Sequence, residues 1–150
     1  MDENRQLVRR LMIAIERIDQ AYYRAQRRLG IKDAAFVLFY AIADGGTYSQ
    51  KQICQEWSLP RTTLNTVVQE YVGKGYLRLA ATGHKEKEVV LTPAGRAYVQ
   101  EILAPVFAAE ERVMAAFLHT DLTAQTEAFA QRLEEEFAPI GPIQKGEEDG

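Results

Sequence analysis

Apolar residues recur every three or four positions through residues 5–29, which predicts a helix with one apolar face. The residues of that face are Leu7, Leu11, Ile15, Ile18 and Tyr22. Residues 32–43 are apolar around most of a helix circumference, so we expect this second helix at the centre of the fold. Gly30 and the Asp-Gly-Gly sequence at 44–46 are expected to end the two helices.

Two shorter helices, joined by a tight connection, are predicted in the middle of the chain. The first covers residues 49–57, with Ser49 as its N-cap and Gln52 completing a capping box. The second covers residues 61–74. Its inward face is expected to consist of Leu64, Val67, Val68 and Tyr71. Its outward face is expected to carry Thr62, Asn65, Thr66 and Gln69.

A β-hairpin is predicted after Gly75, which should end the preceding helix. Residues 76–82 alternate in polarity, residues 82–87 are polar and contain a glycine, and residues 88–91 form the returning strand. The sequence therefore predicts a two-stranded ribbon directly behind the pair of short helices.

Two further helices are predicted in the last third of the chain. One covers residues 93–118, with Thr92 as N-cap, Pro93 in the first turn and a kink at Pro105. The other runs from Asp121 or Thr123 to residue 137. Residues 1–143 are expected to form a single domain, and the acidic tail that follows, residues 144–150, is expected to be disordered.

Composition limits the class of protein. The chain has 150 residues, one cysteine and a formal charge of −3. This length is typical of one domain, and a lone cysteine indicates a reducing, cytoplasmic location. Neither a secretory signal nor an apolar run long enough for a membrane is present, so no membrane association is expected. With two histidines and one cysteine, neither a metal site nor another cofactor is expected.

The negative charge argues against nucleic-acid binding only until it is divided along the chain. Residues 1–30 carry a net +3, residues 31–92 a net +1, and residues 93–150 a net −7. The acidity therefore belongs to the C-terminal third, and the middle segment must be judged separately.

Two short helices followed by a ribbon are the parts of a winged helix-turn-helix, in which the second helix presents its polar face to the major groove. Three sequences, YSQKQIC (48–54), LPRTTLNTVV (59–68) and VVLTPAG (89–95), in this order and spacing, resemble the MarR family of winged-helix transcription regulators. The resemblance covers roughly residues 5–137. The expected fold is mainly helical with a small hairpin wing, in which residues 31–92 form the DNA-binding lobe and residues 5–29 and 93–137 form dimerisation helices.

The resemblance implies a cytoplasmic homodimer that represses transcription by binding double-stranded DNA at a pseudo-palindromic operator, often under control of a small-molecule effector. Carried over by position, the DNA-binding residues are Ser49, Gln50, Arg61, Thr62, Thr63, Asn65, Thr66 and Lys85. The family wing typically carries Asp-x-Arg, whereas this chain has Gly83, His84 and Lys85 there. An aromatic group is a candidate effector site, although packing also explains it: Tyr22, Tyr23, Phe36, Phe39 and Tyr40.

Two other functions stay open. A winged-helix module that has lost sequence-specific DNA binding and acts through protein contacts would also explain the nearly neutral middle segment. A thiol sensor at Cys54 is the other, although a small packing residue explains that position better. No catalytic constellation is present, so we do not expect an enzyme.

Overall fold

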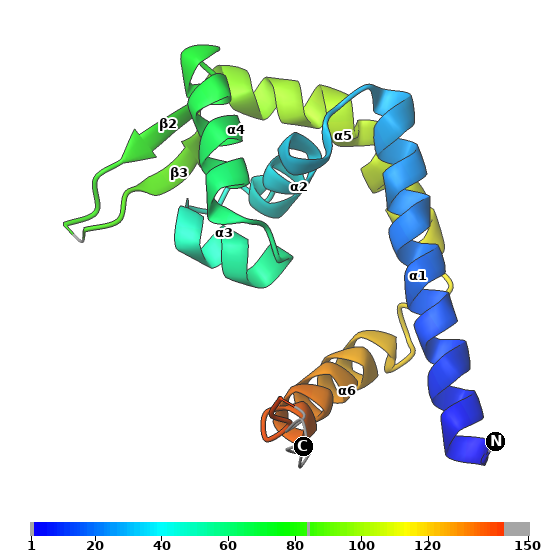
Figure 1. The fold of residues 1–150 in the computed structure, drawn as a ribbon. Helices are drawn as coiled ribbons and strands as arrows, with labels where there is room; N and C mark the ends of the chain where they lie inside the picture. Colours follow the sequence, from blue (N-terminus) through cyan, green and yellow to red (C-terminus); the bar gives the residue numbers. More distant parts are fainter. Residues whose placement is uncertain (1, 84, 143–150) are drawn as a thin grey trace, which may run out of the picture. The chain divides into compact units, whose positions relative to one another are not determined.

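The computed structural model describes residues 2–83 and 85–142 (Figure 1), and the chain divides into two compact units after Phe107. The elements are α1 (Glu3–Leu29), α2 (Asp33–Ile42), β1 (Tyr48–Ser49), α3 (Gln50–Trp57), α4 (Arg61–Gly73), β2 (Leu77–Ala80), β3 (Glu88–Leu91), α5 (Pro93–Met114) and α6 (Leu122–Phe137). The predicted class, mainly α with a small β wing, is confirmed. None of the helices in the described part combines the length and the hydropathy that crossing a bilayer requires.

The predicted helices are all present, with some shifted ends. α1 begins two residues earlier than expected, because Asp2 caps it by accepting a hydrogen bond from the Arg5 amide at 2.8 Å. α5 continues through Pro105 but ends at Met114, short of the predicted residue 118. The predictions for His84 and for the tail at 144–150 lie outside the described residues.

α2 lies at the centre of the first unit, as its apolar circumference predicts. Leu38, Phe39 and Ile42 are at most 1% exposed. The other elements of this unit supply their apolar faces to the same core: Ile53 from α3, four residues of α4, Leu77, Val89 and Leu91 from the strands, and three residues of α5. Helix–helix and helix–sheet packing around one buried helix therefore holds this lobe, residues 31–92 with the first part of α5, together.

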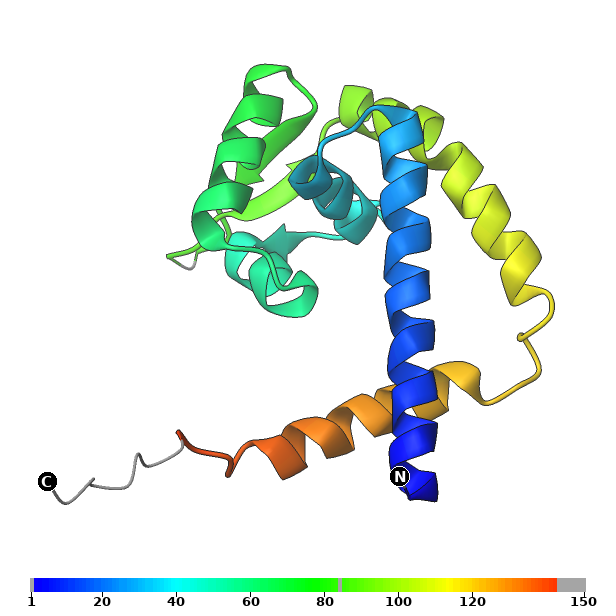
Figure 2. The ribbon, with the colours of Figure 1, turned by 45° about the vertical axis from the view of Figure 1, so that its right-hand side comes forward.

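The sheet has three strands rather than the predicted two. Tyr48 pairs with Val89 and Ser49 with Glu88, which adds β1 antiparallel to β3 and gives the order β1-β3-β2. The prediction missed β1 because two residues are too few to show an alternating pattern. This pairing ties the start of α3 to the base of the hairpin, while the hairpin itself extends beyond the helices (Figures 1 and 2).

The start of α5 is fastened to the end of α4. Thr92 accepts a hydrogen bond from the Gly95 amide at 3.0 Å, so it caps α5 as predicted. Its hydroxyl also donates to the Gly75 carbonyl oxygen at 2.6 Å, and its amide donates to the Tyr76 carbonyl oxygen at 3.1 Å. Gly95 lies so close to this turn that a Cβ there would come within 1.9 Å of the Tyr76 oxygen.

α1 packs against the core of the first unit through residues of its C-terminal half, Tyr22, Ala25 and Leu29. Gln26 is buried and its Nε2 donates to Asp33 at the start of α2, and Gly30 ends α1 in the left-handed conformation with φ of 73°. The apolar face predicted for this helix is otherwise exposed within the chain: Leu7 is 51%, Ile15 41% and Ile18 58% exposed. A helix face of this kind indicates a surface that another molecule covers.

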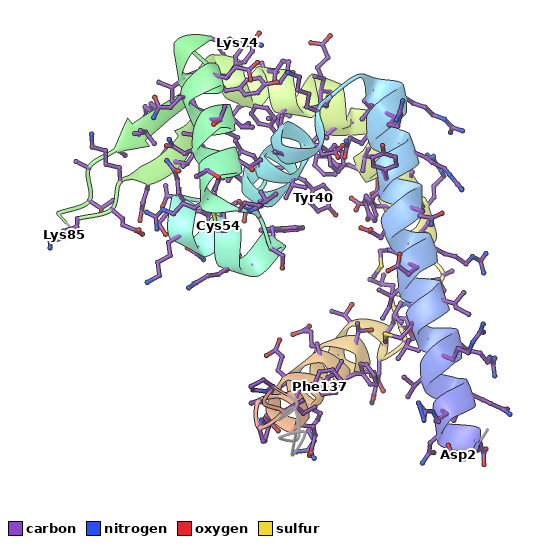
Figure 3. The ribbon with its side chains drawn as sticks, in the orientation of Figure 1. Asp2, Tyr40, Cys54, Lys74, Lys85 and Phe137 are labelled. Atoms are coloured by element: carbon purple, nitrogen blue, oxygen red, sulfur yellow. The ribbon has the colours of Figure 1, made fainter. Side chains whose placement is uncertain are left out.

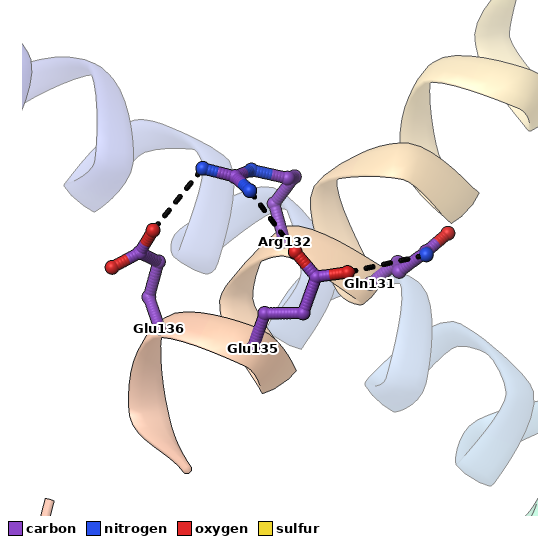
Figure 4. Close-up of polar contacts among 4 residues, drawn as sticks. All are labelled: Gln131, Arg132, Glu135 and Glu136. Carbon is purple, nitrogen blue, oxygen red and sulfur yellow. Dashed lines mark hydrogen bonds and ion pairs between the residues drawn. The ribbon is translucent and has the colours of Figure 1, made fainter. Parts of the chain in front are cut away.

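The second unit contains the end of α5 and the whole of α6. α6 buries none of its residues, and Phe137 is 57% exposed. Arg132 pairs with Glu135 at 3.0 Å and with Glu136 at 3.1 Å, and Gln131 donates to Glu135 at 3.3 Å (Figure 4). Glu135 and Glu136, two of three consecutive glutamates on α6, are thus paired along their own helix.

Candidate nucleic-acid interface

α3 and α4 are joined by the tight connection that a helix-turn-helix needs. Ser49 caps α3 by accepting from the Gln52 amide at 3.1 Å. The Gln52 side chain donates forward to Glu56 at 2.9 Å, so only the Ser49 half of the predicted capping box is observed. Ser58 ends α3 in the left-handed conformation, with φ of 52°, and α4 begins three residues later at Arg61.

α4 has the two faces that its sequence predicts. Leu64, Val68 and Tyr71 are buried in the core, together with Val67, while the polar face is exposed. On that face the Thr66 hydroxyl donates to the Thr62 carbonyl oxygen at 2.9 Å. Because this bond stays within the helix, it orients Thr66 without using another element.

A groove of about 460 Å³ lies between this polar face and the wing. It is lined by Gln50, Arg61, Thr62, Asn65, Gln69, Leu79, Lys85, Glu86 and Lys87. Lys85 projects from the far end of the hairpin (Figure 3). The amide and hydroxyl side chains of the helices can contact base edges, and the arginine and lysines around the same groove can contact phosphates.

The structure brings together five of the eight residues that the sequence analysis assigned to DNA: Gln50, Arg61, Thr62, Asn65 and Lys85. Ser49, Thr63 and Thr66 do not line this groove: Ser49 caps α3, and Thr63 and Thr66 are exposed on α4. The sequence analysis missed Gln69, Leu79, Glu86 and Lys87 as lining residues. The positions of Glu86 and Lys87 beside Lys85 in the predicted turn would have been the signal for the last two.

Arg61 and Glu86 form an ion pair across the groove. Nη2 of Arg61, in the first turn of α4, lies 2.9 Å from Oε1 of Glu86 on the wing. The two side chains are 62% and 36% exposed, so the contact is open to solvent and to competing ions. The residue expected to meet a phosphate therefore has a carboxylate partner from its own chain.

Lys74 lies away from the groove, at the opposite end of α4. Its Nζ is 3.2 Å from Glu70 Oε1 and 4.8 Å from the centre of the Tyr71 ring. Lys74 is therefore engaged at the C-terminal end of α4, where a positive charge is favourable.

The loop before β1 is held by a hydrogen bond between Tyr48 and Asp44. The Tyr48 hydroxyl donates to one oxygen of Asp44, and the Gly46 amide donates to the other at 2.9 Å. The bond from Tyr48 is the main cause that lowers the pKa of Asp44, and the same bond raises the pKa of Tyr48. The carboxylate thus fixes the turn from which α3 starts.

The five candidate effector residues divide into separate contacts. Tyr22, Phe36 and Tyr40 lie together, with Tyr40 5.8 Å from Tyr22 and 5.9 Å from Phe36 between ring centres. Trp57 and Phe107 complete this cluster at 5.5 and 6.1 Å from Tyr40, and the sequence analysis missed both.

Phe39 and Tyr23 lie outside that cluster, so the five residues do not form the single group that was predicted. Phe39 is fully buried and faces Tyr71 and Tyr98 in the core. Tyr23 is exposed on α1 and accepts a hydrogen bond from Arg27 at 3.1 Å. The difference arises because neighbouring residues on a helix point in different directions.

Cys54 is half-buried and packs against the hydrophobic core (Figure 3). Within the described residues, no three His, Cys, Asp or Glu side chains come close enough together to hold a metal ion.

The MarR family model matches residues 29–87, which span α2, the helix-turn-helix and the first part of the wing. Over these residues the chain is similar to the MarR family. No similar protein was found among curated proteins.

Several solved structures, including one of a MarR family regulator, have the same fold. The regulator NMB1585 of Neisseria meningitidis is 23% identical, with a TM-score of 0.63 over 91% of this chain and 99% of that chain. BldR of Sulfolobus solfataricus is 16% identical, with a TM-score of 0.66 over 90% and 99%. NadR, solved in complex with 4-hydroxyphenylacetate, is 16% identical, with a TM-score of 0.60 over 87% and 91%. The comparisons therefore show a winged-helix fold over most of the chain and a similarity to the MarR family over residues 29–87.

Proposed function

We propose that this MarR-type chain is a cytoplasmic homodimer that represses transcription by binding a pseudo-palindromic operator in double-stranded DNA. The observation that carries the proposal is the groove between α4 and the wing, where Asn65 on the helix faces the same opening as Lys85 and Lys87. Asn65 has the donor and acceptor pair that recognises adenine, and the lysines neutralise phosphates. Ser49, Thr63 and Thr66 remain proposed contacts at the edges of this surface.

The second part of the proposal is the dimer. The exposed apolar face of α1, from Leu7 to Ile18, needs a cover in water, and a second copy of α1 supplies a matching face. Two copies would present two α4 helices, which suits half-sites about one helical turn apart. Occupation of the operator would then exclude RNA polymerase.

The third part concerns an effector. We assign it to the cluster around Tyr40, with Tyr22 and Phe36, because aromatic rings favour a small aromatic ligand. Tyr23 and the buried Phe39 would respond indirectly. NadR was solved with 4-hydroxyphenylacetate, so this acid is the first probe to test for release of bound DNA. A Tyr40→Leu variant is expected to bind DNA normally and to lose that response.

The DNA-binding proposal is tested by selecting duplexes from a random pool with the purified protein and titrating the best 30-base-pair duplex at several salt concentrations. We expect the logarithm of the affinity to fall linearly with the logarithm of the salt concentration. Lys85→Ala should reduce that slope by about 0.9, the contribution of one phosphate contact. Lys74→Ala is the matched control and should leave the slope unchanged.

The same titration separates this function from the alternative of a protein-interaction module. A module that has lost DNA binding would enrich no sequence and would bind the selected duplex no better than a random one. That result would refute the proposal, whatever the oligomeric state.

A further inference from the structure

Among the described residues, the Arg61–Glu86 pair differs in kind from the other ion pairs. Those pairs join residues three or four positions apart on one helix, whereas Arg61 and Glu86 are 25 positions apart and come from α4 and the wing. This contact therefore links α4 to the wing within the groove, whereas the other pairs lie along a single helix.

Glu86 offers Arg61 the same chemistry that a DNA phosphate offers. A carboxylate and a phosphate both present oxygens that accept charge-assisted hydrogen bonds from a guanidinium group. Around the groove, Arg61, Lys85 and Lys87 attract phosphates, while Glu86 is the single acidic residue in the lining. A phosphate that approaches Arg61 must therefore replace the Glu86 carboxylate and tolerate its charge.

We propose that Glu86 acts as a phosphate mimic that occupies Arg61 in the free protein and lowers its affinity for DNA. This inference rests on the proposed DNA-binding function and adds a residue that tunes it. In this arrangement the Glu86 carboxylate opposes DNA binding, because it pairs with Arg61, the cation that α4 would otherwise offer to a phosphate.

The size of the effect follows from the exposure of the pair. An open ion pair of this kind is weak, so a phosphate displaces it at a small cost. Removing the carboxylate should tighten DNA binding by about two- to fivefold at physiological salt. The slope of affinity against salt should also become steeper, by up to about 0.9, because Arg61 then neutralises a phosphate.

The test compares the wild type with Glu86→Gln, which keeps the size of the side chain and removes its charge. Glu70→Gln is the matched control, because it removes the same charge from an exposed ion pair on α4, the helix that carries Arg61, but outside the groove. Both are titrated against the selected 30-base-pair duplex between 50 and 200 mM salt, after circular dichroism has shown that they fold like the wild type. We expect tighter binding for Glu86→Gln alone, with an advantage that shrinks about threefold across this salt range.

Arg61→Ala shows whether Glu86 acts through Arg61. In the wild-type background Arg61→Ala should reduce the salt slope by less than Lys85→Ala does, and in the Glu86→Gln background it should remove the whole gain. Equal affinities for Glu86→Gln and Glu70→Gln, or weaker binding by Glu86→Gln, would overturn the inference and leave the DNA-binding function intact. If neither the wild type nor any variant prefers the selected duplex, both proposals are wrong.

Discussion

Gly95 provides the sharpest test of how the wing is attached to the rest of the lobe. A Cβ at this position would lie 1.9 Å from the Tyr76 carbonyl oxygen, 2.9 Å from its carbon and 3.2 Å from Leu91 Cδ2. Real Cβ atoms essentially never approach closer than 3.0 Å, and here the obstacle is backbone, which cannot rotate away as a side chain can. Gly95→Ala must therefore push the start of α5 about 1 Å from the turn.

That displacement breaks identifiable contacts. The bond from the Thr92 amide to the Tyr76 oxygen is already 3.1 Å long, and the bond from the Thr92 hydroxyl to the Gly75 oxygen crosses the same gap. Each lost hydrogen bond costs about 1 kcal/mol, and residual overpacking adds about 1–3 kcal/mol. Alanine recovers up to about 1 kcal/mol as a better helix former than glycine. We expect Gly95→Ala to lower the free energy of unfolding by about 2–4 kcal/mol.

Urea unfolding followed by circular dichroism measures this loss. With a urea dependence of about 2 kcal/mol per molar, the midpoint should fall by about 1–2 M. Gly73→Ala is the matched control, because the same substitution at the end of α4 meets nothing within 4 Å and should be neutral or slightly stabilising. A Gly95→Ala protein as stable as Gly73→Ala would show that the close approach of α5 to Tyr76 is not a feature of the folded protein.

Two further predictions concern the dimer and the buried tyrosines. Ile18 is 58% exposed in the chain, and its burial in both copies of a dimer should contribute about 2–3 kcal/mol. Ile18→Glu should therefore raise the dimer dissociation constant, measured by sedimentation equilibrium, by about 30-fold or more. Gln20→Glu is the control, because it makes the same charge change on the opposite face of α1 and should leave the dissociation constant unchanged. Burial, with a hydrogen bond to Tyr71, raises the pKa of Tyr98 from 10.0 to about 12. Between these two pH values the unfolded state loses a proton that the folded state keeps. The free energy of unfolding should therefore fall as the pH rises, by up to about 1.4 kcal/mol per pH unit. Urea titrations from pH 9 to 11 should show a smaller decline for Tyr98→Phe; an identical decline would contradict the assignment.

The features that the sequence predicted well are those fixed by local periodicity. In α4, the inward positions and the polar face follow directly from the helical repeat, and both are found as expected. Gly30 ends α1 because only a residue without a side chain adopts its left-handed conformation without strain. Five of the residues assigned to DNA meet at one groove, because their positions follow from the order of helix, turn and wing.

The features that were missed depend on contacts between distant segments. β1 exists because Tyr48 and Ser49, which follow the Asp44 turn, pair with β3 about forty residues further along the chain. No local pattern in the sequence encodes such a pairing. The candidate aromatic group divided because Phe39 and Tyr40, adjacent in sequence, point to different neighbours once α2 is packed. The Arg61–Glu86 pair is of the same kind, since its geometry depends on where the wing lies relative to α4.

The charge of the groove, rather than the charge of the chain, determines how this protein would meet DNA. The net charge of −3 conceals a small positive set in which Arg61, Lys85 and Lys87 outnumber Glu86. With so few cations, each one carries a large share of the electrostatic affinity, and one carboxylate in the same groove offsets part of it. A chain with only Lys85 and Lys87 from the wing lining this groove, and an acid between them, should therefore rely more on base contacts from Thr62 and Asn65 than on phosphate attraction. Its preference for a selected duplex over random DNA should accordingly persist at salt concentrations that abolish non-specific binding.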